Sequence, residues 1–493
     1  MGIIQKQSIT GTVYSYVGVI LGFITSALLF PRMLSTEQVG LLRILVSYSV
    51  ILAQFAVLGM NAVTVKFFPY FRDQAKKHHG YIGLVLMVSL AGAVISLAAY
   101  LSLHDYLTTS AGEKSRLFVS YFYYVIPLFI FTLLFNVFDT YLRVLYNAVK
   151  GIVYKEIVQR VLIIVSVLMF FLGIVDFHTF VLLYVTAFMI PALLLMATLI
   201  AGNNFNVLPD WDFIDKTKLR AISGIAFFGL LSSYSGVLIM NIDSVMIDHY
   251  LGLSQTGIYT ITFFFGTLII IPARTMNKIS SVVIADSWKK NDTSNILSIY
   301  KKSSLLLAIA GAFAFIGIWV NIENVFKIIG PDYEQGKYVI FFIGLANVVE
   351  AFAGPSSLII ANSSKYKWLS FFLLVYTVLI IVTNIIFIPV WGIVGAALAS
   401  FLSRFIFVLI RFFFLKHWFD LQPYSYRHML ILAISVIALF LTSLIPQNEN
   451  FWIDTLIRSA FVSAVFVPLI YVSGISDDFN KTVRTILRFG KDN

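Results

Sequence analysis

The chain has 493 residues, of which 59% are apolar and 12% are charged. Soluble domains usually carry about 25% charged residues, so an ordinary cytosolic enzyme is excluded. The 46 Phe and 25 Tyr residues exclude a disordered chain. In a chain this apolar, the net charge of +11 indicates cationic loops on the cytoplasmic side of a membrane rather than nucleic-acid binding. The sequence contains no cysteine, which excludes disulfides and thiolate metal ligands.

Apolar windows bounded by charged residues, Pro, Gly or Asn predict fourteen membrane-spanning helices. The predicted spans are 10–30, 40–61, 81–102, 117–139, 158–175, 178–200, 223–246, 256–282, 303–321, 338–361, 368–388, 391–412, 429–446 and 456–474. We therefore predict an all-α integral membrane protein. No segment between spans is long enough to fold as a separate domain.

The cations alternate from one side of the predicted membrane to the other. With the N-terminus inside, 25 of the 35 Lys and Arg residues fall at inner segments and five fall in outer loops. The inner set includes Arg143, Lys155, Arg160 and Arg411. The remaining five, Arg43, Arg274, Lys278, Arg404 and Arg458, lie within spans. Because loops rich in Lys and Arg stay cytoplasmic, we predict that both termini lie in the cytoplasm.

An internal repeat relates the first spans of the two halves. Ser15–Ile20 matches Ser233–Leu238, Gly40–Leu42 matches Gly257–Tyr259, and Met60-Asn61 matches Met276-Asn277, at offsets of 218, 217 and 216 residues. A weaker match pairs Leu134–Asp139 with Leu345–Glu350. A repeat of six spans keeps the same orientation in the membrane, which places a substrate site between two parallel bundles.

The repeat predicts the domain organisation. Two six-helix lobes related by a parallel pseudo-twofold axis are followed by two C-terminal helices. The predicted boundaries are 1–200 for the N-lobe, 201–222 for a cytoplasmic linker, 223–415 for the C-lobe, 416–474 for the thirteenth and fourteenth helices, and 475–493 for a basic cytoplasmic tail.

Three motifs resemble a known superfamily. Asp243–Ile247 with Leu251–Leu253 and Gly257–Tyr259 resembles the junction of the seventh and eighth helices in the MOP superfamily, which contains MATE exporters, lipid II flippases and polysaccharide flippases. Pro389–Ala399 resembles its eleventh-to-twelfth-helix junction, and Gly40–Leu42 resembles the start of its second helix. The chain is most similar to the bacterial polysaccharide flippases of the Wzx type.

The resemblance implies a function. It implies two lobes around a central cavity, alternating access, and transport of a polyprenyl-pyrophosphate-linked oligosaccharide from the inner to the outer leaflet for cell-surface polysaccharide biosynthesis. The two extra C-terminal helices resemble those of the fourteen-helix members, where they accommodate the lipid tail.

Ionisable groups within spans are costly, at roughly 2.5–3.5 kcal/mol at the membrane centre, and are functional candidates. Glu350 and Arg404 both lie near the midplane of the predicted C-lobe, so their charges could pair. One interpretation is a buried ion pair that fixes helix packing. The other is a cavity site, with Arg404 for an anionic head group and Glu350 as a coupling-ion or proton site.

Arg274 and Lys278 are four residues apart on the eighth span and therefore share a helix face. Asn277 is adjacent, and Pro272 could open the backbone toward a cavity. Two cations on one face suit a pyrophosphate, whose oxygens accept several charge-assisted hydrogen bonds. The alternative is that both side chains snorkel to the cytoplasmic interface.

Arg43 and Asp243 lie near the outer ends of the second and seventh spans. These helices face each other in the resembled fold, so we predict an outer gate in which the two residues pair, with plain interfacial anchoring as the alternative. Asn61 is, with Asn277, a polar candidate for the cavity wall.

No motif indicates catalysis. The sequence has no Walker A motif and no G-x-S-x-G nucleophile, so we expect no enzyme, no catalytic residue, no metal site and no bound cofactor. Energy would then come from an ion gradient, with H+ and Na+ as candidates, from the membrane potential, or from substrate removal. We expect a monomer whose partners are the lipid-linked oligosaccharide, membrane lipids, and a polysaccharide polymerase with glycosyltransferases.

Two other functions compete with the flippase. A cation-coupled, MATE-like exporter of small organic cations would use acidic cavity residues, for which Glu350, Asp243 and Asp139 are available. An integral-membrane glycan polymerase or ligase would need a sizeable outer loop, and the predicted outer loops are short.

Overall fold

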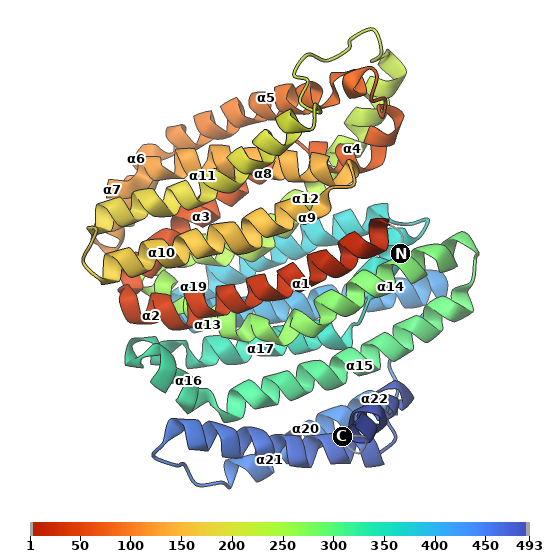
Figure 1. Cartoon of the computed structure of the whole chain (residues 1–493). Helices are drawn as coiled ribbons and strands as arrows, with labels where there is room; N and C mark the ends of the chain where they lie inside the picture. The colour runs from red at the N-terminus through yellow and green to blue at the C-terminus, as the bar shows by residue number, and fades with distance from the viewer. Residues whose placement is uncertain (1–2, 490–493) are drawn as a thin grey trace. The chain divides into compact units, whose positions relative to one another are not determined.

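The computed structural model describes residues 3–489, so residues 1–2 of the predicted N-lobe and 490–493 of the predicted tail lie outside the described part. Every regular element within residues 3–489 is a helix (Figure 1), which confirms the all-α prediction. The chain divides into two compact units, Met1–Thr260 and Ile261–Asn493. We describe each unit by itself.

Unit 1 consists of long helices joined by short connections. Its α-helices are α1 (Ile3–Phe23), α2 (Phe30–Met33), α3 (Thr36–Ala56), α4 (Met60–Phe67), α5 (Tyr81–Ser102), α6 (His104–Ala111), α7 (Arg116–Tyr121), α8 (Val125–Val144), α9 (Ala148–Val153), α10 (Arg160–Phe171), α11 (Phe177–Ala201), α12 (Lys216–Leu251) and the first half of α13 (Leu253–Thr267). π-helical stretches, η1 (Ile24–Leu29) and η6 (Tyr154–Gln159), join α1 to α2 and α9 to α10.

Unit 2 has the same character. Its helices are the second half of α13, then α14 (Ile271–Lys289), α15 (Thr293–Val320), α16 (Ile322–Ile329), α17 (Lys337–Phe352), α18 (Ser356–Asn362), α19 (Lys367–Phe419), α20 (Tyr426–Ser443), α21 (Phe451–Val472) and α22 (Asp477–Phe489).

All fourteen predicted spans are helical. By length and composition, eleven helical segments of the described chain can cross a membrane, or twelve if the bent pair α17–α18 forms one span. The predicted spans 368–388 and 391–412 are both contained in α19. The predicted fifth span, 158–175, overlaps the helical run 148–171, which carries too many charged residues to count among the eleven. The fifth span was therefore predicted with the wrong limits.

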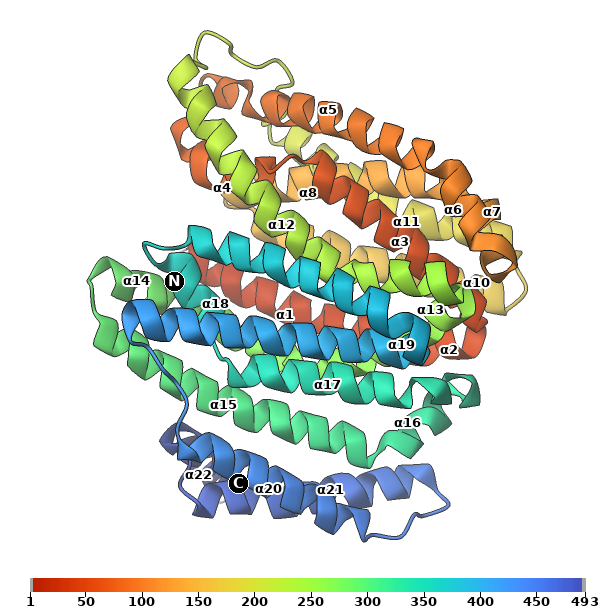
Figure 2. The ribbon, with the colours of Figure 1, turned by 180° about the vertical axis from the view of Figure 1, so that it is seen from behind.

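The 53 residues of α19 form two arms rather than one straight rod. At Gly392 the backbone has φ 59° and ψ −139°, a conformation that only glycine adopts readily. The two arms lie side by side (Figure 2): the rings of Tyr376 and Phe407 stack at 4.7 Å, and the hydroxyls of Thr383 and Ser403 are 3.0 Å apart. Gly392 is thus the turn between the eleventh and twelfth predicted spans.

The second helix of each predicted repeat is interrupted. α3 stops at Ala56, and positive φ angles at Leu58 and Gly59 precede α4. In the other copy, a 3-10 turn at Leu268–Ile270 separates α13 from α14. Asn61 is the second residue of α4, whereas Asn277 is the seventh residue of α14, so the two breaks do not fall at equivalent positions of the predicted repeat.

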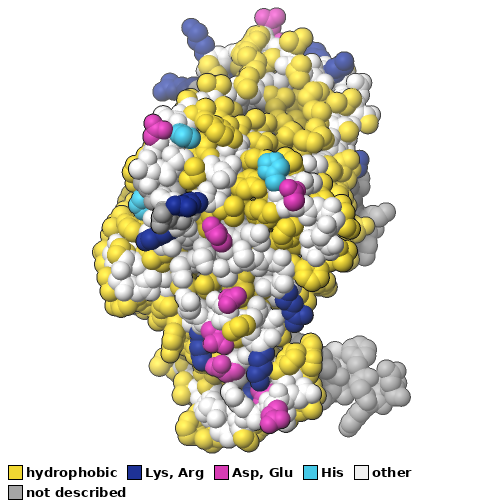
Figure 3. Space-filling model, turned by 90° about the vertical axis from the view of Figure 1, so that its left-hand side faces the viewer, with side chains coloured by type: hydrophobic (Ala, Val, Ile, Leu, Met, Phe, Trp, Pro, Cys, Tyr) yellow, Lys and Arg dark blue, Asp and Glu magenta, His cyan; other side chains and the backbone are white. Residues whose placement is uncertain are grey.

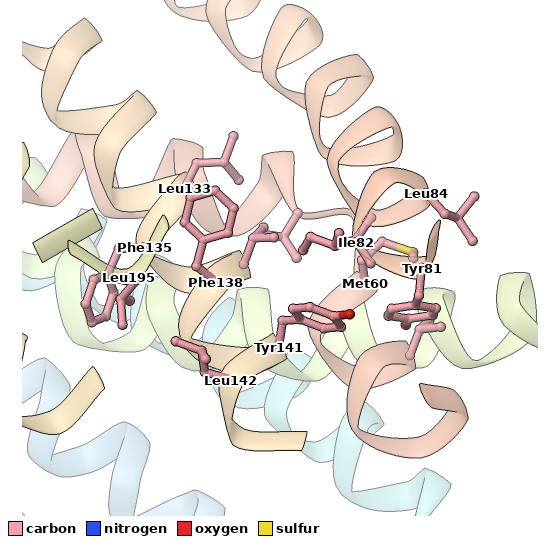
Figure 4. Close-up of a cluster of buried hydrophobic side chains, with 14 of the residues drawn as sticks. Met60, Tyr81, Ile82, Leu84, Leu133, Phe135, Phe138, Tyr141, Leu142 and Leu195 are labelled. Carbon is pink, nitrogen blue, oxygen red and sulfur yellow. The ribbon is translucent and has the colours of Figure 1, made fainter. Parts of the chain in front are cut away.

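The core of unit 1 is formed by buried side chains from several helices. Met60 of α4, Tyr81 of α5, Phe138 and Tyr141 of α8, and Leu195 of α11 converge in one cluster (Figure 4). Since lipid tails are as apolar as these side chains, close packing rather than exclusion of water holds such helices together. This cluster therefore fixes the position of α8, which carries part of the site described below.

Figure 3 shows one face of the molecule, on which hydrophobic and uncharged atoms cover most of the surface and charged side chains are scattered between them.

Candidate functional site

A group of charged side chains occupies the helix that follows α8. Residues 140–157 were predicted to lie between spans, but helix covers Ala148–Phe171 without a gap. The uncharged part after Arg160 is only about 17 Å long at 1.5 Å per residue, whereas the hydrocarbon core is about 30 Å thick. A span built on this helix therefore carries Lys155, Glu156 and Arg160 within the membrane.

These side chains form the unit 1 charge cluster, which we define as Asp139, Arg143, Lys155, Glu156 and Arg160. Arg143 Nη2 lies 3.0 Å from Asp139 Oδ2, and Arg160 Nη2 lies 2.8 Å from Glu156 Oε2. Both pairs have the i, i+4 spacing of neighbours on one helix face. This spacing of opposite charges is a sequence signal for helix, although the segment was predicted to lie between spans.

Like Arg143, Lys155 is an exposed cation of the cluster. Its ammonium lies 5.2 Å from the centre of the Phe135 ring, and it makes no hydrogen bond or ion pair with the described residues. It belongs to the π-helical stretch Tyr154–Gln159, and π-helical turns inside α-helices are frequent at functional sites. Lys155 therefore offers a positive charge to a ligand.

Arg43 of α3 contacts α12, the helix that carries its predicted partner Asp243, but its hydrogen bonds go to other groups of that helix. Its Nε donates to Ser244 Oγ at 2.9 Å and its Nη2 donates to the Met240 carbonyl at 2.9 Å. Asp243, next to Ser244 and buried, accepts a hydrogen bond of 2.7 Å from Tyr259 Oη. The structure thus brings Arg43 to the predicted segment of α12, where a hydroxyl and a backbone carbonyl hold the guanidinium.

Glu350 pairs with Arg411 rather than with Arg404. Arg411 Nη2 lies 2.6 Å from Glu350 Oε2 and Nη1 lies 3.0 Å from Oε1, which is a bidentate pair. The Arg411 side chain is 0% exposed, although the sequence analysis counted it among the inner segments. Arg404 donates instead to Tyr376 Oη at 3.1 Å and to Asn347 Oδ1 at 3.2 Å.

Arg274 and Lys278 lie on α14 and are both exposed. Neither makes a hydrogen bond or ion pair with the described residues. The side-chain amide oxygens (Oδ1) of Asn277 and of its repeat equivalent Asn61 are buried without a hydrogen-bond partner among the described residues. The structure thus leaves two cations of α14 available to a ligand.

The acids and the cations of the candidate site therefore differ in how they are held. Each of the acids Asp139, Glu156 and Glu350 has an arginine partner, whereas three cations, Lys155, Arg274 and Lys278, are exposed. The arrangement is suited to an anion more than to a cation.

The polysaccharide biosynthesis protein family matches residues 4–284. No curated protein matches the chain. Among solved structures, the lipid II flippase MurJ in an inward closed conformation is similar over 94% of this chain and 99% of its own, with a TM-score of 0.71 and 15% identity. An inward-facing multidrug resistance MATE transporter of the MOP superfamily is similar over 85% of this chain and 98% of its own, with a TM-score of 0.63 and 17% identity.

These two likenesses concern the fold, and they confirm the MOP fold that the motifs at Gly40, Asp243 and Pro389 indicated. The chain is thus a multi-pass membrane protein of the polysaccharide biosynthesis protein family, with the fold of a MOP-superfamily transporter.

Proposed function

We propose that this protein is a flippase of the bacterial cytoplasmic membrane, which moves a polyprenyl-pyrophosphate-linked oligosaccharide from the inner to the outer leaflet by alternating access. The observation that carries the proposal is the set of exposed cations on membrane-embedded helices, Lys155 in unit 1 with Arg274 and Lys278 in unit 2. The family match to polysaccharide biosynthesis proteins supports this class of substrate.

The chemistry of the pyrophosphate explains why such cations would be retained. An unpaired cation near the membrane centre costs about 2.5–3.5 kcal/mol on insertion scales. A pyrophosphate offers several oxygens that accept charge-assisted hydrogen bonds, which are about twice as strong as neutral ones. Binding the head group at Lys155, or at Arg274 and Lys278, would offset part of that cost, and it would shield the negative charge during its passage.

The pairing of the acids argues against the small-cation exporter. Such a transporter needs a carboxylate that is free to attract its substrate. Of the three acids available to such an exporter, Asp139 and Glu350 are each held by an arginine within 3.0 Å, and Asp243 accepts a hydrogen bond from Tyr259. The MATE likeness of the fold keeps this exporter as the second candidate.

A liposome experiment tests the proposal. The purified chain is reconstituted with a fluorescent polyprenyl-pyrophosphate oligosaccharide, and an impermeant quencher reports the fraction in each leaflet over time. We expect protein-dependent equilibration that slows about tenfold to a hundredfold in Lys155→Gln, since one charge-assisted hydrogen bond is worth about 1.5–3 kcal/mol. Arg274→Gln/Lys278→Gln should slow it at least as much.

Matched variants control for loss of charge alone. Lys150 lies on the same helical run as Lys155, and Lys289 ends α14; both are exposed, and Lys150→Gln and Lys289→Gln should equilibrate the lipid at the normal rate. Imposed H+ and Na+ gradients test the predicted coupling in the same vesicles. If folded protein does not equilibrate the lipid under any gradient but exports a cationic dye, the flippase proposal is wrong and the exporter takes its place.

A further inference from the structure

A cavity of about 380 Å³ lies in unit 2, and none of the charged residues of the candidate site lines it. Its walls come from the first part of α15, from the connection between α19 and α20, and from the start of α22, which contacts both α15 and α21. Four cations line it: Lys301, Lys302, Arg427 and Lys481. Asp477 and Asp478 line it too and leave its net charge positive.

Three of the four cations are available to a ligand. Arg427 Nη1 donates to the Ile475 carbonyl at 3.1 Å, which ties α20 to the end of α21. Lys301, Lys302 and Lys481 are exposed, and their ammonium groups make no hydrogen bond or ion pair with the described residues. Three ammonium groups around one cavity can donate charge-assisted hydrogen bonds to a multivalent anion such as a phosphate.

The position of the cavity along the helices indicates where that anion resides. The helical segment from Lys302 to Val320, where α15 ends, is about 27 Å long at 1.5 Å per residue. This length is close to the thickness of the hydrocarbon core, about 30 Å. At the same level α20 begins at Tyr426 and α21 ends at Val472. The cations therefore lie at the depth of lipid head groups.

Beyond its first turn, α20 presents an exposed apolar face. Met429, Leu432, Val436 and Phe440 of α20 are exposed by 68%, 43%, 65% and 64%, and their spacing of three and four residues places them on one helix face. Leu305 of α15 forms part of the cavity wall itself. A ligand with a phosphate at one end and alkyl chains at the other would match both features.

We propose that this cavity binds the phosphate head group of an anionic membrane phospholipid, whose acyl chains extend into the adjacent hydrocarbon core. The bound lipid would bridge α15, the connection 420–425 and α22, and thereby brace the α20–α21 pair against α15. This site is separate from the proposed transport site, and its test does not require flippase activity.

The test measures lipid binding to the purified full chain by native mass spectrometry, with dioleoylphosphatidylglycerol as the anionic probe and dioleoylphosphatidylcholine as the zwitterionic one. We expect selective binding of the anionic lipid, weakened about tenfold or more by Lys301→Gln/Lys302→Gln. The charge-matched control Lys216→Gln/Lys289→Gln removes two exposed lysines at other helix ends, and it should bind as the unmodified chain does. Lys301→Arg/Lys302→Arg keeps the charge and should retain binding, which separates loss of the site from loss of folding.

Three results would overturn the proposal. They are equal binding of the two lipids, equal loss of binding in the pocket and control variants, and failure of the arginine variant to bind although it is folded. A fourth arm adds inorganic phosphate in detergent. If phosphate alone displaces the anionic lipid and stabilises the chain against heat as the lipid does, the site takes a soluble phosphate compound and the assignment to a membrane lipid is wrong.

Discussion

Gly40 and Gly257, which occupy equivalent positions in the two repeats, pack backbone against backbone. A Cβ atom at Gly257 would lie 1.9 Å from the Thr36 carbonyl oxygen and 3.1 Å from the Gly40 nitrogen, and one at Gly40 would lie 2.0 Å from the Leu253 carbonyl oxygen. Beside them the hydroxyls of Thr36 and Ser254 are 2.8 Å apart. Each copy thus presents the same small patch to the other, as in a contact across a twofold axis.

This contact predicts a specific cross-link. Because the chain has no cysteine, Thr36→Cys/Ser254→Cys would carry the only thiols, and oxidation should join them in high yield. If the proposed alternating access requires α3 and α13 to separate here, the oxidised protein should stop flipping and recover on reduction. Unchanged flipping in fully cross-linked protein would contradict a gate at this point.

Gly40→Ala and Gly257→Ala should each lower the yield of that cross-link several-fold, because backbone atoms that face the added methyl group cannot rotate away. Gly236→Ala is the matched control, since nothing lies within 4 Å of a Cβ atom at this position of α12. Equal yields in all three variants, measured by gel shift, would show that the close approach does not exist in the membrane.

The bidentate pair of Glu350 and Arg411 predicts an asymmetry between single and double variants. Arg411→Ala leaves a carboxylate without its partner and should destabilise the protein by about 3–5 kcal/mol, whereas replacing both residues by Met should cost much less. Arg404→Ala should have a smaller effect, because Arg404 is not the partner of Glu350. Thermal unfolding in detergent measures the order, and a double variant less stable than Arg411→Ala would contradict the pairing.

The contacts of Arg43 predict that a charge swap with Asp243 fails. Arg43→Asp removes two hydrogen bonds from a charged donor, each worth about 1.5–3 kcal/mol, and should abolish transport in the liposome assay. Asp243→Arg in the same chain should not restore it, because Arg43 contacts Ser244 and Met240 while the Asp243 carboxylate accepts from Tyr259. Recovery in the double variant would instead establish the direct pair that the sequence suggested.

The turn in α19 predicts a further requirement. Any residue that replaces Gly392 must adopt a positive φ with ψ near −139°, and this backbone strain costs about 1–3 kcal/mol. Gly392→Ala should lower the unfolding temperature, while Gly317→Ala in α15, where nothing lies within 4 Å of a Cβ atom, should not. Fluorescence-detected melting compares the two, and equal melting temperatures would mean that the two arms of α19 are not joined by this turn.

The sequence by itself determined the helices and the family. A membrane span needs about 20 apolar residues and satisfies its backbone hydrogen bonds within the segment, so each span is a local property that a window can detect. The equivalence of Gly40 and Gly257 was also visible as a repeat. The fifth span was predicted with the wrong limits because its charges, at Lys155, Glu156 and Arg160, interrupt the apolar pattern.

Only the tertiary structure decided which charges meet and which stay free. Arg404 and Arg411 lie seven residues apart, about two helical turns, and therefore share a face of α19. Which of them reaches Glu350 depends on the register of α19 along α17 and on the fold-back at Gly392, and neither can be read from periodicity. The same reason applies to Arg43, whose partners on α12 are set by how two helices pack, and to Lys155, whose exposure depends on the helices around it.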